Sequence, residues 1–210
     1  SAKAKEAIVI ASNNASLYPD GNAFYLKQSL AKQLPNIQID QITVGNGSND
    51  VLEIIARSFA DKDSAIMYSQ HAFAVYPIVT QAIGATHQMV DAVNWGQDLV
   101  AMQAAITEKT KVIFIANPNN PTGAGYSKGT LLKIIEVARK HKLIIFADEI
   151  YDKIIYDEAK HIAMASLADD ILIISFNGLS KSYRVAGFRA GWMVISGAKD
   201  HAKDYIEGME

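Results

Sequence analysis

The sequence predicts an α/β fold, in which helices cover both faces of a mainly parallel sheet. Short apolar segments such as residues 143–147 and 171–175 alternate with longer segments whose apolar residues recur at helical spacing. The short segments are apolar throughout rather than at every second position, which is typical of strands buried on both faces. The length of 210 residues fits one large or two small domains, and we expect residues 1–210 to form a single large domain.

The elements are expected in alternation along the chain. We expect strands at residues 42–44, 65–68, 87–90, 111–116, 143–147, 171–175 and 191–195. Helices are expected at residues 48–60, 72–83, 98–106 and 127–141, the last capped by Ser127. Ligands of such sheets bind beyond the carboxyl ends of the strands, so polar residues that follow each strand are the candidate site residues.

Composition excludes several classes of function. The net charge is −2 and the charges are mixed along the chain, so no basic surface for nucleic acid is expected. The longest apolar runs are too short to cross a membrane, and the amino-terminal residues lack the apolar core of a secretory signal. The chain has no cysteine. We therefore expect a soluble, cytoplasmic protein.

Lys181 carries the most functional information. It follows an apolar strand inside a turn rich in serine and glycine, and Arg189 comes eight residues later. A lysine can form an imine with an aldehyde, and a fixed cation can hold a phosphate. Pyridoxal 5′-phosphate requires both. The alternative is a surface loop with an exposed lysine and arginine.

The run at residues 45–49 lies between an expected strand and an expected helix. The N–H groups of Gly47, Ser48 and Asn49 would form an anion site at the helix amino terminus. An ordinary glycine turn with Ser48 as the cap is the alternative. The dinucleotide-binding fingerprint fails, because Asp50 stands where its last glycine should be.

Three further strand ends carry candidates. Phe73 could stack on a ring face, although core packing is the commoner fate of an aromatic residue. Asn120, between the two prolines of the run at 117–123, is held extended by Pro121 and can point its amide at one acceptor. Asp148 ends a buried strand, where a carboxylate needs a cation or donors, and a pyridinium nitrogen is such a cation. The alternative for Asn120 is a plain turn, and the alternative for Asp148 is an aspartate that caps the start of a loop.

Taken together and in this order, the residues resemble the fold-type I pyridoxal phosphate aminotransferases along essentially the whole chain. Residues 1–123, with the runs at 18–22 and 45–50, resemble histidinol-phosphate aminotransferase. Residues 126–210, with the runs at 147–152 and 176–192, resemble the bacterial alanine aminotransferases. A chimeric, reconstructed or unusual sequence with a seam near 123–126 is therefore our hypothesis.

The resemblance implies a role for each candidate. Lys181 would be the Schiff-base lysine and Asp148 the partner of the pyridine nitrogen. Tyr151 and Asn120 would donate hydrogen bonds to the phenolate oxygen, and Phe73 would stack on the ring face. The phosphate would be held by Gly47, Ser48, Asn49, Ser180 and Arg189. Tyr18 resembles the tyrosine that reaches the phosphate of a neighbouring subunit, which implies a homodimer.

Two departures from the family pattern bear on function. Many relatives carry a hydroxyl residue three positions before the lysine, where this chain has Gly178. The family also has a small carboxyl-terminal domain with an arginine for the substrate carboxylate, and no arginine follows Arg189 here. We therefore expect the small domain to be missing. The residues that bind the cofactor would then be complete, and those that bind the substrate would not.

The expected function is transfer of an amino group between an amino acid and a 2-oxo acid. Histidinol-phosphate aminotransferase, an enzyme of histidine biosynthesis, is the preferred type and an alanine type is the alternative. A minimal or engineered domain that binds the cofactor with little turnover is a second hypothesis. A Ser–Lys hydrolase using Ser180 or Ser182 is a third, but adjacent side chains point apart. No metal is expected, because the histidines are scattered without ligand spacing.

Overall fold

The computed structural model describes residues 2–14, 16–119, 122–123 and 125–204. The chain divides into two compact units, Ser1–Ile39 and Asp40–Glu210. The first unit contains α1 (Ala2–Ser12) and α2 (Phe24–Ala31), and α1 buries none of its residues. The side chain of Asp20 accepts hydrogen bonds from the N–H groups of Asn22 and Phe24 at 3.1 and 2.8 Å, just before α2 begins.

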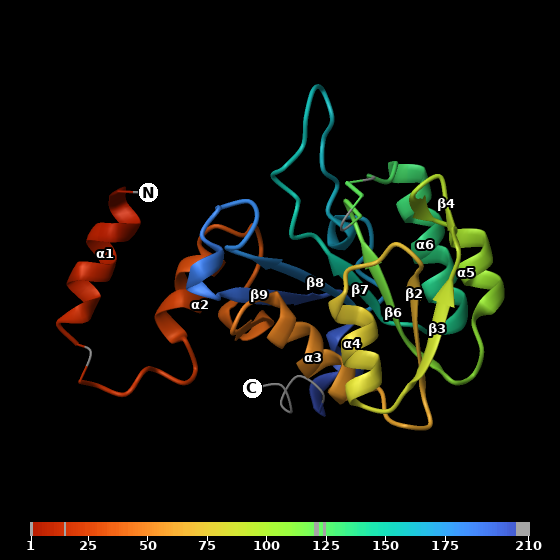
Figure 1. Ribbon diagram of the computed structural model, residues 1–210, viewed down its shortest axis with the longest axis horizontal. Helices are drawn as coiled ribbons and strands as arrows, with labels where there is room; N and C mark the ends of the chain where they lie inside the picture. Colours follow the sequence, from red (N-terminus) through yellow and green to blue (C-terminus); the bar gives the residue numbers. More distant parts are fainter. Residues whose placement is uncertain (1, 15, 120–121, 124, 205–210) are drawn as a thin grey trace. The chain divides into compact units, whose positions relative to one another are not determined.

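The second unit is built on a seven-stranded sheet with the order β1-β9-β8-β7-β6-β2-β3 (Figure 1). Its strands are β1 (Ile42–Gly45), β2 (Ala65–Ser69), β3 (Thr86–Val90), β6 (Thr110–Ala116), β7 (Ile145–Asp148), β8 (Ile173–Gly178) and β9 (Gly191–Ser196). Only β9 runs against its neighbours, so the expected mainly parallel sheet is confirmed. A separate two-stranded hairpin joins β4 (Ala92–Val93) and β5 (Gly96–Gln97).

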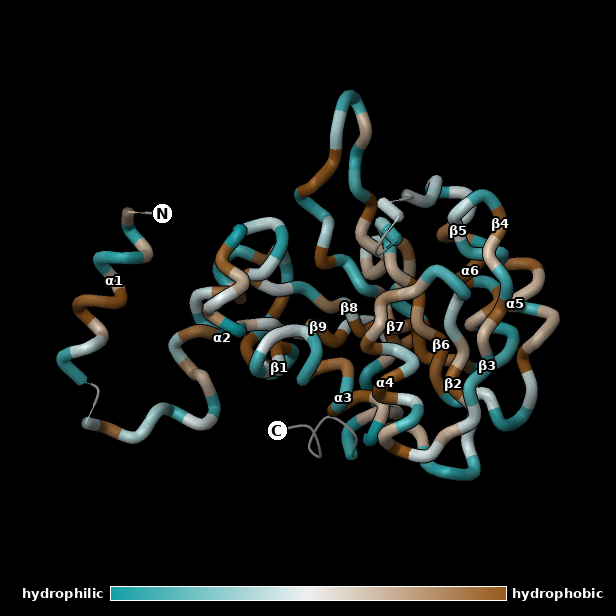
Figure 2. Tube along the Cα trace, in the orientation of Figure 1, coloured by the Kyte–Doolittle hydropathy of each residue, from teal (hydrophilic) through white to brown (hydrophobic). Residues whose placement is uncertain are grey.

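Helices cover both faces of this sheet, as the sequence predicts. On one face, α3 (Ser48–Phe59) and α4 (Val75–Ala82) pack against strand residues such as Tyr68, Phe146 and Phe176. On the other, α5 (Leu99–Ala105) and α6 (Lys128–His141) pack against Met67 and Ala147. Because successive strand residues point to opposite faces, each buried strand serves both cores. Figure 2 shows the apolar residues gathered along the central strands.

Several predicted boundaries move, and the shifts concern the site. The expected helix at 72–83 begins only at Val75, so Phe73 lies in an irregular segment. The strand expected at 143–147 is Ile145–Asp148, because Lys142 ends α6 in the left-handed conformation with φ of 53°. The strand expected at 171–175 extends to Gly178, because Asn177 and Gly178 pair with β9. Such long-range pairing is not visible in the local sequence.

None of the helices in the described ranges is long and apolar enough to cross a membrane.

Candidate cofactor site

A cavity of about 200 Å³ brings together most of the predicted residues. It lies at the sheet edge where β1, β7 and β8 end and where the antiparallel β9 begins. Its lining consists of Ser48, Asn49, Phe73, Asp148, Ile150, Ser180, Lys181, Ala186 and Arg189. Arg189 reaches this edge because β9 is antiparallel, so that its amino end lies beside the carboxyl ends of its neighbours.

A row of glycines lets one turn lie close to the sheet. Gly45, Gly191 and Gly178 are in register across β1, β9 and β8. A Cβ atom on Gly191 would overlap the backbone nitrogen of Ser48, so only glycine allows this approach. Gly47 has φ of +83°, and the Arg189 guanidinium occupies the space that a side chain there would need. The turn therefore presents the amino terminus of α3 to the cavity.

Arg189 supplies the cation at this end of the cavity. Its Nη1 donates to the carbonyl oxygen of Ala186 at 3.0 Å and to Oγ of Ser180 at 3.5 Å. The guanidinium also lies against Gly47, and Ser48 and Asn49 line the same cavity. A cation, hydroxyl groups and helix amino-terminal N–H groups are the donors that bind phosphate. The predicted phosphate residues are thus neighbours in space.

Asp148 provides a buried carboxylate on the cavity wall, with 4% of its surface exposed. Oδ2 accepts from the Tyr76 hydroxyl at 2.8 Å, and Oδ1 accepts from the Ile150 N–H at 3.2 Å. Burial raises the pKa of Asp148, while these hydrogen bonds and the Lys181 charge oppose the shift. A cation placed against this carboxylate would offset the cost of its burial.

Tyr76 is the main site residue that the sequence did not reveal. It is 1% exposed and stacks on Phe114, with ring centroids 4.4 Å apart and planes 7° apart. Burial and the nearby Asp148 raise the pKa of its hydroxyl well above the usual value, so it remains a donor. In the sequence it is one apolar-face residue of a short helix, which indicates only core packing.

Lys181 lies in a turn that the neighbouring Ser182 connects to the residues after β7. Oγ of Ser182 lies 3.2 Å from the Ile150 carbonyl oxygen and 3.1 Å from Oδ1 of Asp152. These contacts turn the Ser182 hydroxyl toward the strand end, which argues against its use as a nucleophile paired with Lys181. The lysine Nζ lies 5.8 Å from the centre of the Tyr151 ring, so Tyr151 stands beside it.

Two predicted residues cannot be placed in the cavity. Asn120 lies outside the described residues. Tyr18 belongs to the first unit, where it is fully exposed. Gly47 and Tyr151 are not among the lining residues either. Gly47 shapes the turn before α3, and Tyr151 lies next to Lys181.

Glu149 is the residue after β7 and is not among the residues that line the cavity. Its Oε1 accepts from the Met164 N–H at 2.8 Å and lies 3.6 Å from Nε2 of His161. Burial alone would lower the pKa of His161, but the Glu149 carboxylate outweighs it and raises that pKa. Glu149 therefore anchors the return of the long loop after β7 instead of facing the cavity.

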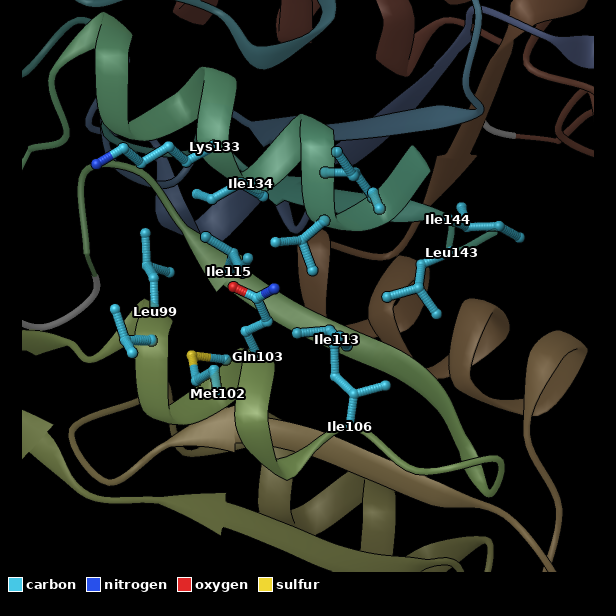
Figure 3. A pocket seen from close by; sticks show the side chains of 14 residues that line it. Leu99, Met102, Gln103, Ile106, Ile113, Ile115, Lys133, Ile134, Leu143 and Ile144 are labelled. Carbon is cyan, nitrogen blue, oxygen red and sulfur yellow. The ribbon is translucent and has the colours of Figure 1, made fainter. Parts of the chain in front are cut away.

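A second cavity lacks this chemistry. It measures about 110 Å³ and lies between α5 and α6 (Figure 3). Its lining is aliphatic apart from Gln103 and Lys133, so it offers no carboxylate and no cluster of anion donors. Over the described part of the chain, no group of three or more histidine, aspartate or glutamate side chains could hold a metal ion.

The fold and the first cavity define an α/β domain with a lysine, a buried aspartate and an arginine at one sheet edge. The chain belongs to the family described as aminotransferase class I and II, whose model matches residues 1–209. Members of this family depend on pyridoxal 5′-phosphate.

Individual relatives agree with this assignment. The chain is 49% identical to the glutamate-pyruvate aminotransferase AlaA of Escherichia coli over 190 residues, which cover 86% of this chain and 45% of that protein. It is 43% identical to histidinol-phosphate aminotransferase 1 of Idiomarina loihiensis, covering 92% and 52%. A crystal structure of an aminotransferase from Escherichia coli matches with a TM-score of 0.90 and 38% identity, covering 96% and 52%. The chain thus spans about half the length of these relatives.

Proposed function

We propose that this chain binds pyridoxal 5′-phosphate at the described sheet edge and forms the cofactor half of an aminotransferase site. The observation that carries the proposal is the convergence of Lys181, Asp148 and Arg189 on one cavity from three different strand ends. Each has the chemistry that one part of the cofactor needs: an amine for the aldehyde, a carboxylate for the ring nitrogen and a cation for the phosphate.

The residues fit the cofactor from both ends. At the anionic end, Arg189, Ser180 and the start of α3 would hold the phosphate. At the far end, the buried Asp148 would meet the protonated ring nitrogen, and this cation would relieve the unfavourable burial of the carboxylate. Phe73 also lines the cavity and would cover a ring face.

When bound, the cofactor supplies an electron sink for bonds at the α-carbon of an amino acid. The chain's own residues then have defined tasks. Asp148 would be kept ionised by the ring cation and would hold the proton on the ring nitrogen. Lys181 would attach the cofactor, and the amine of the substrate would replace it at the aldehyde carbon. The free Lys181 amine would then be placed to take the proton from the α-carbon of the substrate. Tyr151, beside Lys181, would donate to the phenolate oxygen, as would Asn120.

The amino donor and acceptor form the finer part of the proposal. The 49% identity to a glutamate-pyruvate aminotransferase supports glutamate or alanine and the matching 2-oxo acid as substrates. The histidinol-phosphate type that the sequence favours remains the second candidate, supported by a relative at 43% identity. A homodimer with shared sites, a cytoplasmic location, a single domain and a seam near 123–126 also remain predictions.

Absorbance spectra of the purified chain mixed with pyridoxal phosphate test the proposal directly. We expect a band of the bound cofactor that borohydride abolishes, with the reduced adduct found on Lys181 by peptide mass spectrometry. Conversion to pyridoxamine phosphate on addition of alanine, glutamate or histidinol phosphate would then rank the substrates. A spectrum identical to that of the free cofactor would refute binding, and binding without conversion would support the minimal-domain alternative.

A further inference from the structure

The side chain of Asn119 connects three segments near the proposed cofactor site. Its Nδ2 donates to the carbonyl oxygen of His71 at 3.2 Å and to the Thr122 hydroxyl at 2.7 Å, and it lies 3.5 Å from the carbonyl oxygen of Trp95. Asn119 follows β6, His71 follows β2, and Trp95 lies in the β4–β5 hairpin. With 1% of its surface exposed, Asn119 is a buried link between them.

The His71 segment is the one that carries Phe73. It connects β2 to α4 without regular structure, so it lacks the backbone ladder that fixes a strand. The Gln70 N–H donates to the Val90 carbonyl oxygen at 2.8 Å, and the Asn119 amide donates to the carbonyl oxygen of the following residue, His71. Phe73 lines the cavity two residues later. Among the described residues, the Asn119 bond is the last hydrogen bond of this segment before Phe73, whose ring packs edge-on against Tyr76 with centroids 5.9 Å apart.

The β4–β5 hairpin also contacts Asn119, and its turn residues adopt an unfavourable backbone conformation. Asn94 and Trp95 have φ of 52° and 63°, a left-handed conformation that is unfavourable for a bulky residue. Such strain persists only where surrounding contacts determine it. Here the Trp95 ring stacks on the His71 ring, with centroids 4.9 Å apart and planes 24° apart, and its carbonyl oxygen faces Asn119.

The third segment consists of Thr122 and Gly123, which follow β6. The Gly123 N–H donates to the Asn119 carbonyl oxygen at 2.7 Å, and the Thr122 hydroxyl accepts from the Asn119 side chain. The backbone and the side chain of Asn119 thus bind Gly123 and Thr122 and connect them to the Phe73 segment.

We infer that Asn119 is a positioning residue that sets where Phe73 lies over the cofactor ring. The inference rests on the proposed function. Asn119 is not among the residues that line the cavity, so it would act indirectly, through its hydrogen bond to the His71 carbonyl oxygen. The donor nitrogen is the essential feature. An aspartate of the same shape offers no donor and would place a carboxylate against two carbonyl oxygens.

The variants Asn119→Ala, Asn119→Asp and Phe73→Ala test this by titration with pyridoxal phosphate. Loss of a buried donor predicts that both Asn119 variants bind about tenfold more weakly, with Asp no better than Ala. The double variant Asn119→Ala/Phe73→Ala should bind no more weakly than Phe73→Ala alone, because residues that act through one contact are not additive. Asn13→Ala, on the exposed part of the first unit, is the matched control.

The outcomes separate the inference from the proposed function. Should the unaltered chain fail to bind the cofactor, both are wrong. Should it bind, with the Asn119 and Phe73 effects multiplying in the double variant, only the role of Asn119 is wrong, and the same holds if Asn119→Asp binds normally. If Asn119→Ala does not fold by circular dichroism, Asn119→Ser keeps a donor and is expected to lose about threefold, again without a further loss in the Phe73→Ala background.

Discussion

The Tyr76 hydroxyl donates to Oδ2 of Asp148 at 2.8 Å, so a residue of α4 holds the carboxylate that ends β7. The bond crosses from helix to sheet, and both residues are buried. It leaves the carboxylate oriented toward the cavity and partly offsets the effect of burial on its pKa. Tyr76 therefore influences the proposed cofactor site without lining the cavity.

Removing this hydroxyl should weaken cofactor binding. In Tyr76→Phe the ring and its stacking on Phe114 remain, while Asp148 loses one donor and its pKa rises further. We expect about a tenfold weaker affinity for pyridoxal phosphate, since hydrogen bonds to charged groups are worth more than neutral ones. Titration by absorbance measures it, and an unchanged affinity would contradict the role of Tyr76.

Replacing the proposed attachment residue should abolish covalent binding. In Lys181→Ala we expect no adduct after borohydride and no band of the attached cofactor, because no other amine lines the cavity among the described residues. Lys160→Ala, an exposed lysine on the loop after β7, is the control and should behave like the parent chain. A persistent adduct at the cavity in Lys181→Ala would refute the assignment.

Arg189 should discriminate between phosphorylated and unphosphorylated cofactor. Arg189→Ala removes the cation but leaves the amine and Asp148, so affinity for pyridoxal phosphate should fall at least tenfold while affinity for pyridoxal stays within about twofold. Competition titrations with the two aldehydes give the ratio. Equal losses for both ligands would indicate a structural role for Arg189 instead.

The raised pKa of Asp148 predicts a pH dependence of stability. Because the folded state binds this proton more tightly than the unfolded state, the contribution is full below the ordinary aspartate pKa. It is lost as pH rises through the raised folded value. Chemical denaturation of the cofactor-free chain should therefore show a decline over this range that is weaker in Asp148→Asn. An identical profile in the variant would exclude Asp148 as its source.

The Glu149–His161 pair predicts a second dependence at higher pH. The folded pKa of His161 is raised, so the pair stabilises fully below the ordinary histidine pKa of 6.5 and loses this contribution as pH rises through the folded value. His161→Gln should remove the step from the stability profile. Nuclear magnetic resonance titration of the His161 ring provides an independent check, and a folded pKa at or below 6.5 would contradict the prediction.

The sequence alone was sufficient for the fold class and for the identity of most cavity residues. Apolar strands alternating with amphipathic helices predict a covered parallel sheet, and residue chemistry after each strand marks Lys181, Asp148 and the turn at Gly47. These features are local, because element type and residue chemistry depend on near neighbours in the chain.

The tertiary structure decided what depends on distant segments meeting. The antiparallel β9 brings Arg189 to Gly47, although 141 positions separate them in the printed sequence. Core packing brings the Tyr76 hydroxyl to the Asp148 carboxylate. Three segments that are distant in the sequence meet where the Asn119 side chain contacts the carbonyl oxygens of His71 and Trp95. Such pairings follow from long-range packing, in which many side chains compete for each position, so neither Tyr76 nor Asn119 carries a local signal of its role.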